Sequence, residues 1–276
     1  KVDAKGQMSG GPQYYLNHAI GGGFGLFLSL FFAIAAVVAS FGIGNMTQAN
    51  TVATSMHDTF GVATWISGVV LAVFTGVVLI GGIKWIGRVT AAFVPMMIVL
   101  YVGGGTLILL LNYADVPGAF ALIFADAFTG TAATGGFVGA TFAAAIRYGV
   151  ARGIFSNESG LGSAAIAAAS AQTRHPVRQG LVAMTQTFID TIIVVSITGL
   201  VIVSTGVWQT DVSPALMTGA GFSHGLPGQW GNIIVTVAIM FFAFSTVLGW
   251  AYYGERCTER LFGIKGVTPY RVLFSA

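Results

Sequence analysis

The chain has 276 residues, of which 55% are hydrophobic and only 8% are charged, and its mean hydropathy is +0.83. So few charged side chains cannot cover a soluble globule of this length, which excludes an ordinary water-soluble domain and favours several membrane-spanning helices. One cysteine, Cys257, excludes a disulfide framework and a multi-cysteine metal site, and the net charge of +3 carries less information than the positions of the charges.

Apolar runs of about 20 residues can cross a hydrocarbon core of about 30 Å as helices. We expect six such helices and the start of a seventh, at residues 23–54, 62–81, 86–111, 135–151, 181–204, 233–253 and from 267 onward. The first is long enough to cross at a strong tilt, and the fourth is short and interrupted by glycine. The sequence therefore predicts an all-α polytopic membrane protein with one transmembrane domain over residues 1–276. The polar opening KVDAKGQMSGGPQ contains no signal peptide and suggests part of a longer protein.

The basic residues predict the orientation of these helices. All twelve Lys and Arg residues fall before the first helix, after the sixth, or in and next to the connections between the second and third helices and between the fourth and fifth. The alternate loops, around His57, 113–134 and 205–230, contain no Lys or Arg. Because cytoplasmic loops are enriched in these residues, Arg152 and Arg256 are expected on the cytoplasmic side of the plasma membrane, the inner membrane of a bacterium.

Polar residues interrupt the first and fourth helices. In GNMTQANTVA, Asn45 and Gln48 are three residues apart and share a helix face. Such a face either bonds to a neighbouring helix or lines a cavity for a small polar solute, and five polar residues in seven favour the cavity. The stretch ATGGFVGATF of the fourth helix, with Gly136, Gly139 and Thr141, is weak enough to unwind and offer free backbone groups to a ligand.

Two further polar features lie in the sixth and fifth helices. Ser245 and Thr246 in FFAFSTVLGW either return their hydrogen bonds to helix carbonyls or supply neutral oxygens to a monovalent cation. Asp190 is the only carboxylate expected near mid-membrane. It is either a coupling-ion or proton site, or a structural acceptor held by Thr187 and Thr191.

Four stretches in chain order carry a family resemblance: GGPQYYL, GNMTQANTVA, GVARGIFSNESGLGSAA and FAFSTVLGWAYYGE. Together they resemble the alanine or glycine:cation symporter family over nearly the whole chain, and the third stretch is the most specific. The resemblance implies a sodium-coupled carrier that imports small neutral amino acids by alternating access. It also implies the inverted-repeat, leucine-transporter-like fold of the amino acid, polyamine and organocation superfamily.

In that fold the chain resembles core helices three to eight, so the missing helices of the same transporter are its expected partners and it is not expected to transport alone. The resemblance implies a substrate site of Gln48, Asn45, Gly136, Gly139, Thr141 and Trp250, and a sodium site that includes Ser245 and Thr246. Sodium is the implied co-transported ion, and alanine, glycine and serine all remain open as substrates.

The stretch GVARGIFSNESGLGSAA ends the fourth helix on the cytoplasmic side. Arg152 and Glu158 are six residues apart, too far for a pair on a straight helix, but the glycines around them permit a turn. With Asn157 they either form a polar gate that closes the inner mouth of the transporter, or a static helix cap.

Other functions fit less well. An intramembrane enzyme needs a nucleophile beside a base, but all four histidines fall in loops. A channel needs repeated polar stripes instead of one midplane cluster. The nearest alternative is a proton-coupled transporter that uses Asp190 as its carrier. The expected partners are the amino acid and the lipid bilayer, and no nucleic acid.

Overall fold

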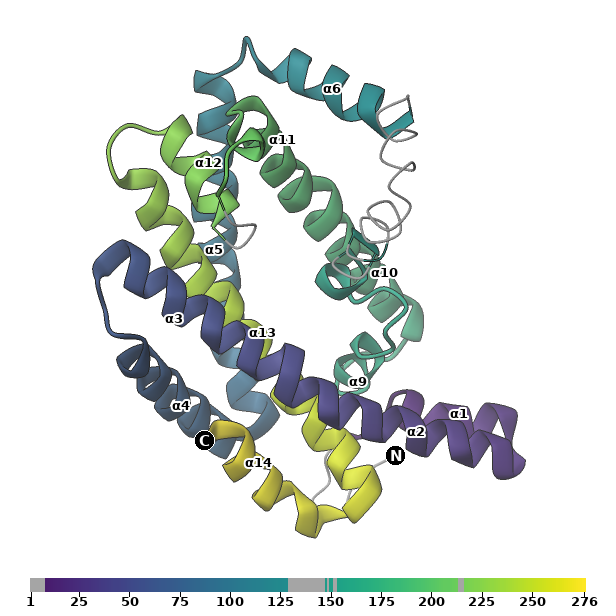
Figure 1. Cartoon of the computed structure of the whole chain (residues 1–276). Helices are drawn as coiled ribbons and strands as arrows, with labels where there is room; N and C mark the ends of the chain where they lie inside the picture. The colour runs from purple at the N-terminus through teal and green to yellow at the C-terminus, as the bar shows by residue number, and fades with distance from the viewer. Residues whose placement is uncertain (1–7, 129–146, 148, 151–152, 213–215) are drawn as a thin grey trace. The chain divides into compact units, whose positions relative to one another are not determined.

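The computed structural model describes residues 8–128, 147, 149–150, 153–212 and 216–276. Every regular element in these residues is a helix, which confirms the all-α prediction (Figure 1). Four helical segments are long and apolar enough to cross a membrane: Gly22–Phe60, Gly82–Leu111, Pro176–Ser204 and Trp230–Phe262. The chain is therefore a multi-pass membrane protein. The predicted fourth helix, 135–151, lies almost wholly outside the described residues.

The first part of the chain follows the predicted order closely. Its elements are α1 (Pro12–Ile20), α2 (Gly22–Phe41), η1 (Gly42–Met46), α3 (Thr47–Phe60), α4 (Thr64–Ile80) and α5 (Gly82–Leu111). The segments α2, η1 and α3 form one continuous span of 39 residues, six residues longer at its end than the predicted 23–54. The short helix α1 was not predicted as a separate element.

The remaining elements show where the prediction of loops was wrong. They are α6 (Val116–Phe128), α9 (Ala164–Ala168), α10 (Pro176–Thr187), η2 (Phe188–Val195), α11 (Ser196–Ser204), η3 (Val207–Gln209), α12 (Met217–Gly225), α13 (Trp230–Phe262), η4 (Ile264–Gly266) and α14 (Val267–Ser275). Helices α6 and α12 occupy stretches that we expected to be loops. The partial helix expected from residue 267 is present as α14.

Two membrane helices contain a π-helical segment, in which backbone hydrogen bonds reach five residues back. In η1 the backbone N–H of Thr47 donates to the carbonyl of Gly42. The second segment, η2, contains Asp190. Each π-turn adds a residue to the helical turn and rotates the residues that follow, so the side chains after it face a different direction from those of an uninterrupted α-helix.

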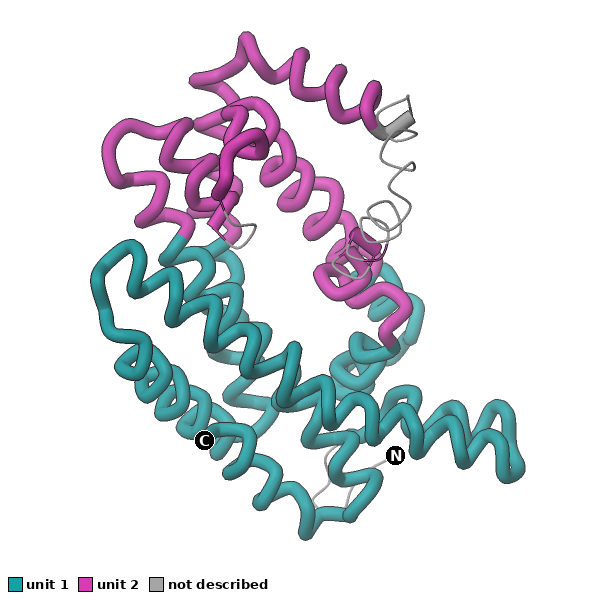
Figure 2. Tube along the Cα trace, viewed as in Figure 1, with its two compact units in different colours: residues 1–97, 162–183, 236–276 teal, residues 98–161, 184–235 magenta. Residues whose placement is uncertain are grey.

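The chain divides into two compact units, coloured separately in Figure 2. Unit 1 comprises residues 1–97, 162–183 and 236–276, and unit 2 comprises 98–161 and 184–235. The divisions fall within α5, α10 and α13 and beside Gly162.

In unit 1, α13 and α14 supply much of the core. Val247, Leu248 and Ala251 of α13 are buried, as are Tyr270 and Phe274 of α14. Phe41 of α2 packs against both aromatic rings of α14, with ring centroids 5.4 Å from Tyr270 and 5.6 Å from Phe274. These contacts hold the first long span against the last two helices of the chain.

In unit 2, the core forms where α5, α11 and α12 meet. The hydroxyls of Tyr101 and Thr198 are 2.6 Å apart, and the ring of Tyr101 lies 5.2 Å from that of Phe222. Phe222 and Val201 are fully buried. The hydroxyl pair gives the phenol of Tyr101 a polar partner inside an apolar core, which burial of such a group requires.

Helix α13 extends nine residues beyond its predicted end at 253, because the charged residues that we placed after it are paired. Glu255 and Arg256 are 2% and 3% exposed and bond to each other. Arg256 also donates to Glu259 over 2.9 Å, and Arg271 of α14 donates to Glu255 from Nε and Nη2 over 2.6 and 3.0 Å. These four residues, which we call the α13–α14 charge cluster, pair their charges with each other and let the helix continue.

The charge cluster leads to a stability prediction. Glu255→Gln keeps the volume of the side chain but leaves Arg256 and Arg271 without their shared carboxylate. Breaking a buried ion pair by removing one partner costs about 3 kcal/mol, roughly 6–12 °C in midpoint for a chain of this size. Thermal unfolding of the purified protein in detergent measures this shift. Asp115→Asn, at an exposed position, is the control; a midpoint for Glu255→Gln equal to that of the control contradicts the prediction.

Candidate functional site

The first long span and α13 cross in unit 1 at an unusually close contact. Gly44 in η1 is buried, and a Cβ atom there would lie 2.5 Å from Cβ and 2.6 Å from Cγ of Trp250. Trp250 is 6% exposed, and its ring packs edge-on against Tyr253 with centroids 5.6 Å apart. The backbone of η1 therefore lies directly against the base of the tryptophan side chain.

The polar residues that follow the π-turn bond to its carbonyls. Thr47 Oγ1 donates to the Gly42 carbonyl over 3.3 Å, and Gln48 Nε2 donates to that of Ile43 over 3.2 Å. Asn45 Nδ2 instead donates to the Phe274 carbonyl in α14 over 2.6 Å. Gln48 and Asn45 thus each use an amide nitrogen within the protein. Within the described residues, no hydrogen bond engages the Oε1 atom of Gln48 or the Oδ1 atom of Asn45.

Ser245 and Thr246 lie one turn before Trp250 on α13. Their hydroxyls donate to the same acceptor, the Phe242 carbonyl, over 2.8 and 2.9 Å. The hydrogen bonds to helix carbonyls that the sequence allowed are therefore present. Each hydroxyl oxygen keeps its lone pairs, so these bonds leave both oxygens able to coordinate a cation.

In unit 2, the turn Ser156–Ser159 is bonded to the helix that carries Asp190. Ser156 Oγ lies 2.8 Å from both carboxylate oxygens of Asp190, and Thr191 Oγ1 lies 3.4 Å from one of them. Asn157 Nδ2 donates to Thr191 Oγ1 over 3.1 Å, and the hydroxyls of Ser159 and Thr187 are 3.3 Å apart. Asp190 is thus held mainly by Ser156, a partner that the sequence did not indicate, while Thr187 bonds to Ser159.

Three residues in and just after this turn have left-handed backbone conformations. Glu158 has φ +56°, and Gly160 and Gly162 follow at +90° and +81°. Glycine adopts these angles freely, whereas a residue with a side chain does so at a cost. The chain therefore turns sharply at Glu158, as the glycines predicted. Arg152, the other expected gate residue, lies outside the described residues, as do Gly136, Gly139 and Thr141.

Within unit 1, the motif GGPQYYL packs against residues 162–169, which begin with the last four residues of GVARGIFSNESGLGSAA. A Cβ atom on Gly10 would lie 2.6 Å from that of Ala169, and one on Gly162 would lie 2.6 Å from Cγ of Pro12. Gln13, also in the first motif, is fully buried and its carbonyl accepts bonds from Ser29 and Arg260. Small residues in both motifs allow this approach, which accounts for several glycines whose role was open from sequence.

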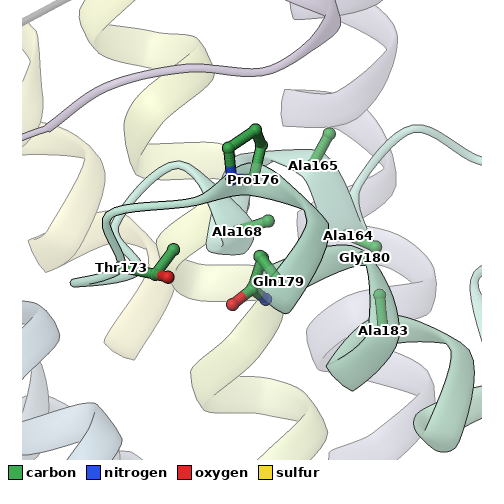
Figure 3. A pocket seen from close by; sticks show the side chains of 8 residues that line it. All are labelled: Ala164, Ala165, Ala168, Thr173, Pro176, Gln179, Gly180 and Ala183. Atoms are coloured by element: carbon green, nitrogen blue, oxygen red, sulfur yellow. The ribbon is translucent and has the colours of Figure 1, made fainter.

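Two cavities of unit 1 differ in whether a predicted site residue lines them. The larger, about 500 Å³, lies between α9 and α10 and contains none of the predicted site residues (Figure 3). Its lining is mostly alanine and glycine, with Thr173 and Gln179 as polar members. The second, about 370 Å³, is lined by Asn45, Val247 and residues of α4 and α14. Asn45 therefore borders a cavity between helices.

The structure thus brings Gly44, Gln48, Trp250 and the hydroxyl pair to one helix crossing, and Asp190 to the Ser156 turn. Sequence reasoning missed Gly44 and Ser156, although both stand within motifs that it singled out. Within the described ranges, no group of three or more His, Cys, Asp or Glu residues can hold a metal ion. The oxygens near the crossing are hydroxyls and carbonyls, which suit a monovalent cation.

Fold and site define a multi-pass helical membrane protein with polar groups inside its spans. The chain belongs to the sodium:alanine symporter family, whose model matches residues 1–276. This confirms the resemblance seen in the sequence motifs, and the family is one of transporters and not of enzymes.

Named relatives support the assignment. The chain is 49% identical to the sodium/alanine symporter AgcS of Methanococcus maripaludis over 99% of this chain and 60% of that protein. It is 48% identical to an uncharacterized transporter of Haemophilus influenzae over 99% of this chain and 59% of that one. It is 35% identical to the probable sodium/glutamine symporter GlnT of Bacillus subtilis over 92% of this chain and 52% of that one. The chain therefore spans between half and two thirds of the length of these relatives.

The bonds between the Ser156 turn and Asp190 lead to a prediction about local opening. Ser156→Ala removes the closest partner of the Asp190 carboxylate, so the backbone amides of 156–160 should exchange with deuterium faster. We expect a roughly threefold to tenfold increase, because one hydrogen bond contributes about 0.5–1.5 kcal/mol net. Hydrogen exchange with mass spectrometry measures it. Ser204→Ala, which removes only a 3.4 Å bond within its own helix, is the control; equal exchange at 156–160 in both variants contradicts the prediction.

Proposed function

We propose that the full-length protein is a sodium-coupled symporter that imports a small neutral amino acid, alanine or glycine, by alternating access. One observation carries the proposal: the crossing of the first long span with α13. There the backbone of η1 lies against Trp250, with Gln48 one turn away on one helix and Ser245 and Thr246 one turn away on the other. Family membership and the names of the relatives agree with this function.

The substrate site follows from the chemistry of these groups. Gln48 Oε1 is an acceptor suited to an ammonium group, while Trp250 offers an apolar wall to a small side chain. The carbonyl oxygen of Asn45 is a second acceptor, on the side of the 370 Å³ cavity. Gly136, Gly139 and Thr141 are proposed to add backbone groups from an unwound helix, as the family resemblance implies.

The sodium site is proposed at Ser245 and Thr246. Both hydroxyls already share the Phe242 carbonyl, so each hydroxyl oxygen lies within 2.9 Å of the same carbonyl oxygen. Neutral oxygens of this kind can replace water around a monovalent cation without placing a charge in the membrane. The rest of the coordination shell is assigned to core helices outside this chain, in the inverted-repeat fold of the superfamily.

The gate and the orientation complete the proposal. Asn157 and Glu158, together with Arg152, are proposed to close the inner mouth at the sharp turn marked by Glu158 and Gly160. The clustering of the Lys and Arg residues at alternate ends of the long apolar runs supports a cytoplasmic position for this turn and for Arg256, and a location in the plasma membrane.

A second candidate, proton coupling, rests on Asp190. Within the described residues its hydrogen-bond partners are the hydroxyls of Ser156 and Thr191, and no cationic side chain pairs with it. A carboxylate inside a membrane span without a cationic partner is a candidate proton carrier. In the sodium-coupled reading, Asp190 instead serves as the structural acceptor that holds the Ser156 turn.

Sodium dependence separates the two candidates. Ser245→Ala and Thr246→Ala each remove one proposed ligand while keeping a good helix former. In reconstituted full-length protein we expect each to raise the sodium concentration for half-maximal uptake roughly tenfold, since losing one hydrogen bond to a charged group costs about 1.5 kcal/mol.

Asp190→Asn is the matched test of the proton candidate. We expect it to leave the sodium concentration for half-maximal uptake unchanged and to alter the stability of the protein or the rate of uptake. Wild-type sodium dependence in both hydroxyl variants, together with loss of pH-driven uptake in Asp190→Asn, replaces the sodium proposal by the proton one.

The substrate site has its own test. Gln48→Ala removes an acceptor and Trp250→Ala an apolar wall, so each should weaken binding of labelled alanine roughly tenfold or more, with a smaller effect on sodium binding alone. Binding to purified full-length protein measures both ligands. The control is Gln179→Ala, which changes a glutamine in the 500 Å³ cavity away from the proposed site. Unchanged alanine affinity in both site variants contradicts the assignment.

A further inference from the structure

A second close contact between the same two helices lies about one turn from the contact between Gly44 and Trp250. A Cβ atom on Gly254 of α13 would lie 2.5 Å from the hydroxyl of Ser40 in α2 and closer still to that of Tyr270 in α14. The Ser40 and Tyr270 hydroxyls are 2.9 Å apart and bond to each other. The two helices therefore meet at two points, Gly44 with Trp250 and Ser40 with Gly254, and run in opposite chain directions where they cross.

Each point depends on a glycine in one helix facing a larger residue in the other. Neither glycine has a left-handed backbone, so both are explained by space and not by conformation. Non-bonded carbon atoms prefer about 3.5–4.0 Å. A methyl group on Gly44, 2.5 Å from Cβ of Trp250, would therefore require a movement of about 1 Å. Because Cβ is fixed to the backbone, rotating the indole cannot provide that movement; the helices themselves must separate.

We propose that Gly44 and Gly254 are specificity-determining positioning residues that set the spacing between Gln48 and Trp250, and hence the size of amino acid side chain that the transporter accepts. The inference rests on the proposed function, in which Gln48 and Trp250 contact the substrate. Gln48 is four residues after Gly44, about one helical turn, and moves with its helix. The position of this glutamine relative to the indole therefore depends on how closely the two helices approach at the glycines.

The proposal predicts the direction of a selectivity change. Widening the gap by about 1 Å removes contacts from alanine and makes room for larger side chains. Since one methylene in an apolar pocket is worth about tenfold or more in discrimination, Gly44→Ala should raise the ratio of valine to alanine uptake roughly tenfold.

The experiment measures sodium-dependent uptake of labelled glycine, alanine and valine in proteoliposomes containing the full-length protein. Uptake ratios do not depend on the amount of folded protein, so a purely structural effect of the methyl group leaves them unchanged. Two matched controls add a methyl group in the same two helices where it meets nothing within 4 Å: Gly42→Ala, two residues before Gly44, and Gly249→Ala, next to Trp250. Both controls should keep the wild-type ratios.

Gly254→Ala is the second variant, and it carries the test if Gly44→Ala does not fold. Its added methyl group meets the hydroxyl groups of Ser40 and Tyr270, which can move aside in part. The ratio of valine to alanine uptake should therefore rise in the same direction, by roughly threefold. Combining Gly254→Ala with Ser40→Ala and Tyr270→Leu removes both obstructing hydroxyls and the ring carbon Cζ of Tyr270, which would lie 2.7 Å from the added methyl group, and should return the ratio toward the wild-type value.

The outcomes separate this inference from the function beneath it. Wild-type ratios in the folded glycine variants, with weakened alanine binding in Trp250→Ala, overturn the inference and leave the function standing. A wild-type protein without sodium-dependent amino acid uptake overturns both. Ratios that rise in both glycine variants and not in the two controls support the spacing role.

Discussion

The free-energy cost of leaving a polar group without a hydrogen-bond or ion-pair partner in apolar surroundings determines much of the structure of this chain. Each break in its membrane helices is followed by side chains that bond to the freed backbone, as Thr47 and Gln48 bond to the carbonyls of η1. Charges at the end of α13 are paired with charges from α14. The polar groups proposed to handle substrate and ion are the same kinds of group that complete the helices, which allows a ligand to replace one protein contact with another.

Close approach of backbones is the second theme, and it depends on residues with little or no side chain. Gly44 and Gly254 bring one pair of helices together, and Gly10 and Gly162 join two motifs that are 150 residues apart in sequence. Without a strong hydrophobic force between helices in lipid, contacts of this kind contribute much of the association energy. The glycine-rich composition therefore serves packing at some positions and backbone conformation at others, such as Gly160.

The order of the long apolar helices that the structure describes could be predicted from the sequence, since long apolar runs depend on the membrane alone. It was misleading at the end of α13, where Glu255 and Arg256 looked like loop residues, because their pairing with α14 is a tertiary contact. The π-turns could not be predicted, since they shift the register by one residue and leave composition unchanged. Gly44 was passed over because a glycine in a membrane helix has many possible roles, and only the position of Trp250 distinguishes among them.

The composition of unit 1 has a consequence for the synthesis and membrane insertion of the protein. Its parts come from the beginning, the middle and the end of the chain, and Ser9 lies 3.5 Å from Glu259, 250 positions later. At translation rates of about 5–20 residues per second, the first long span waits roughly 10–40 s until α13 has been made. During that interval Ser40 and Asn45 lack their partners in α14, Tyr270 and the Phe274 carbonyl. Until α14 has been made, these polar side chains depend on water or on the insertion machinery for hydrogen bonds.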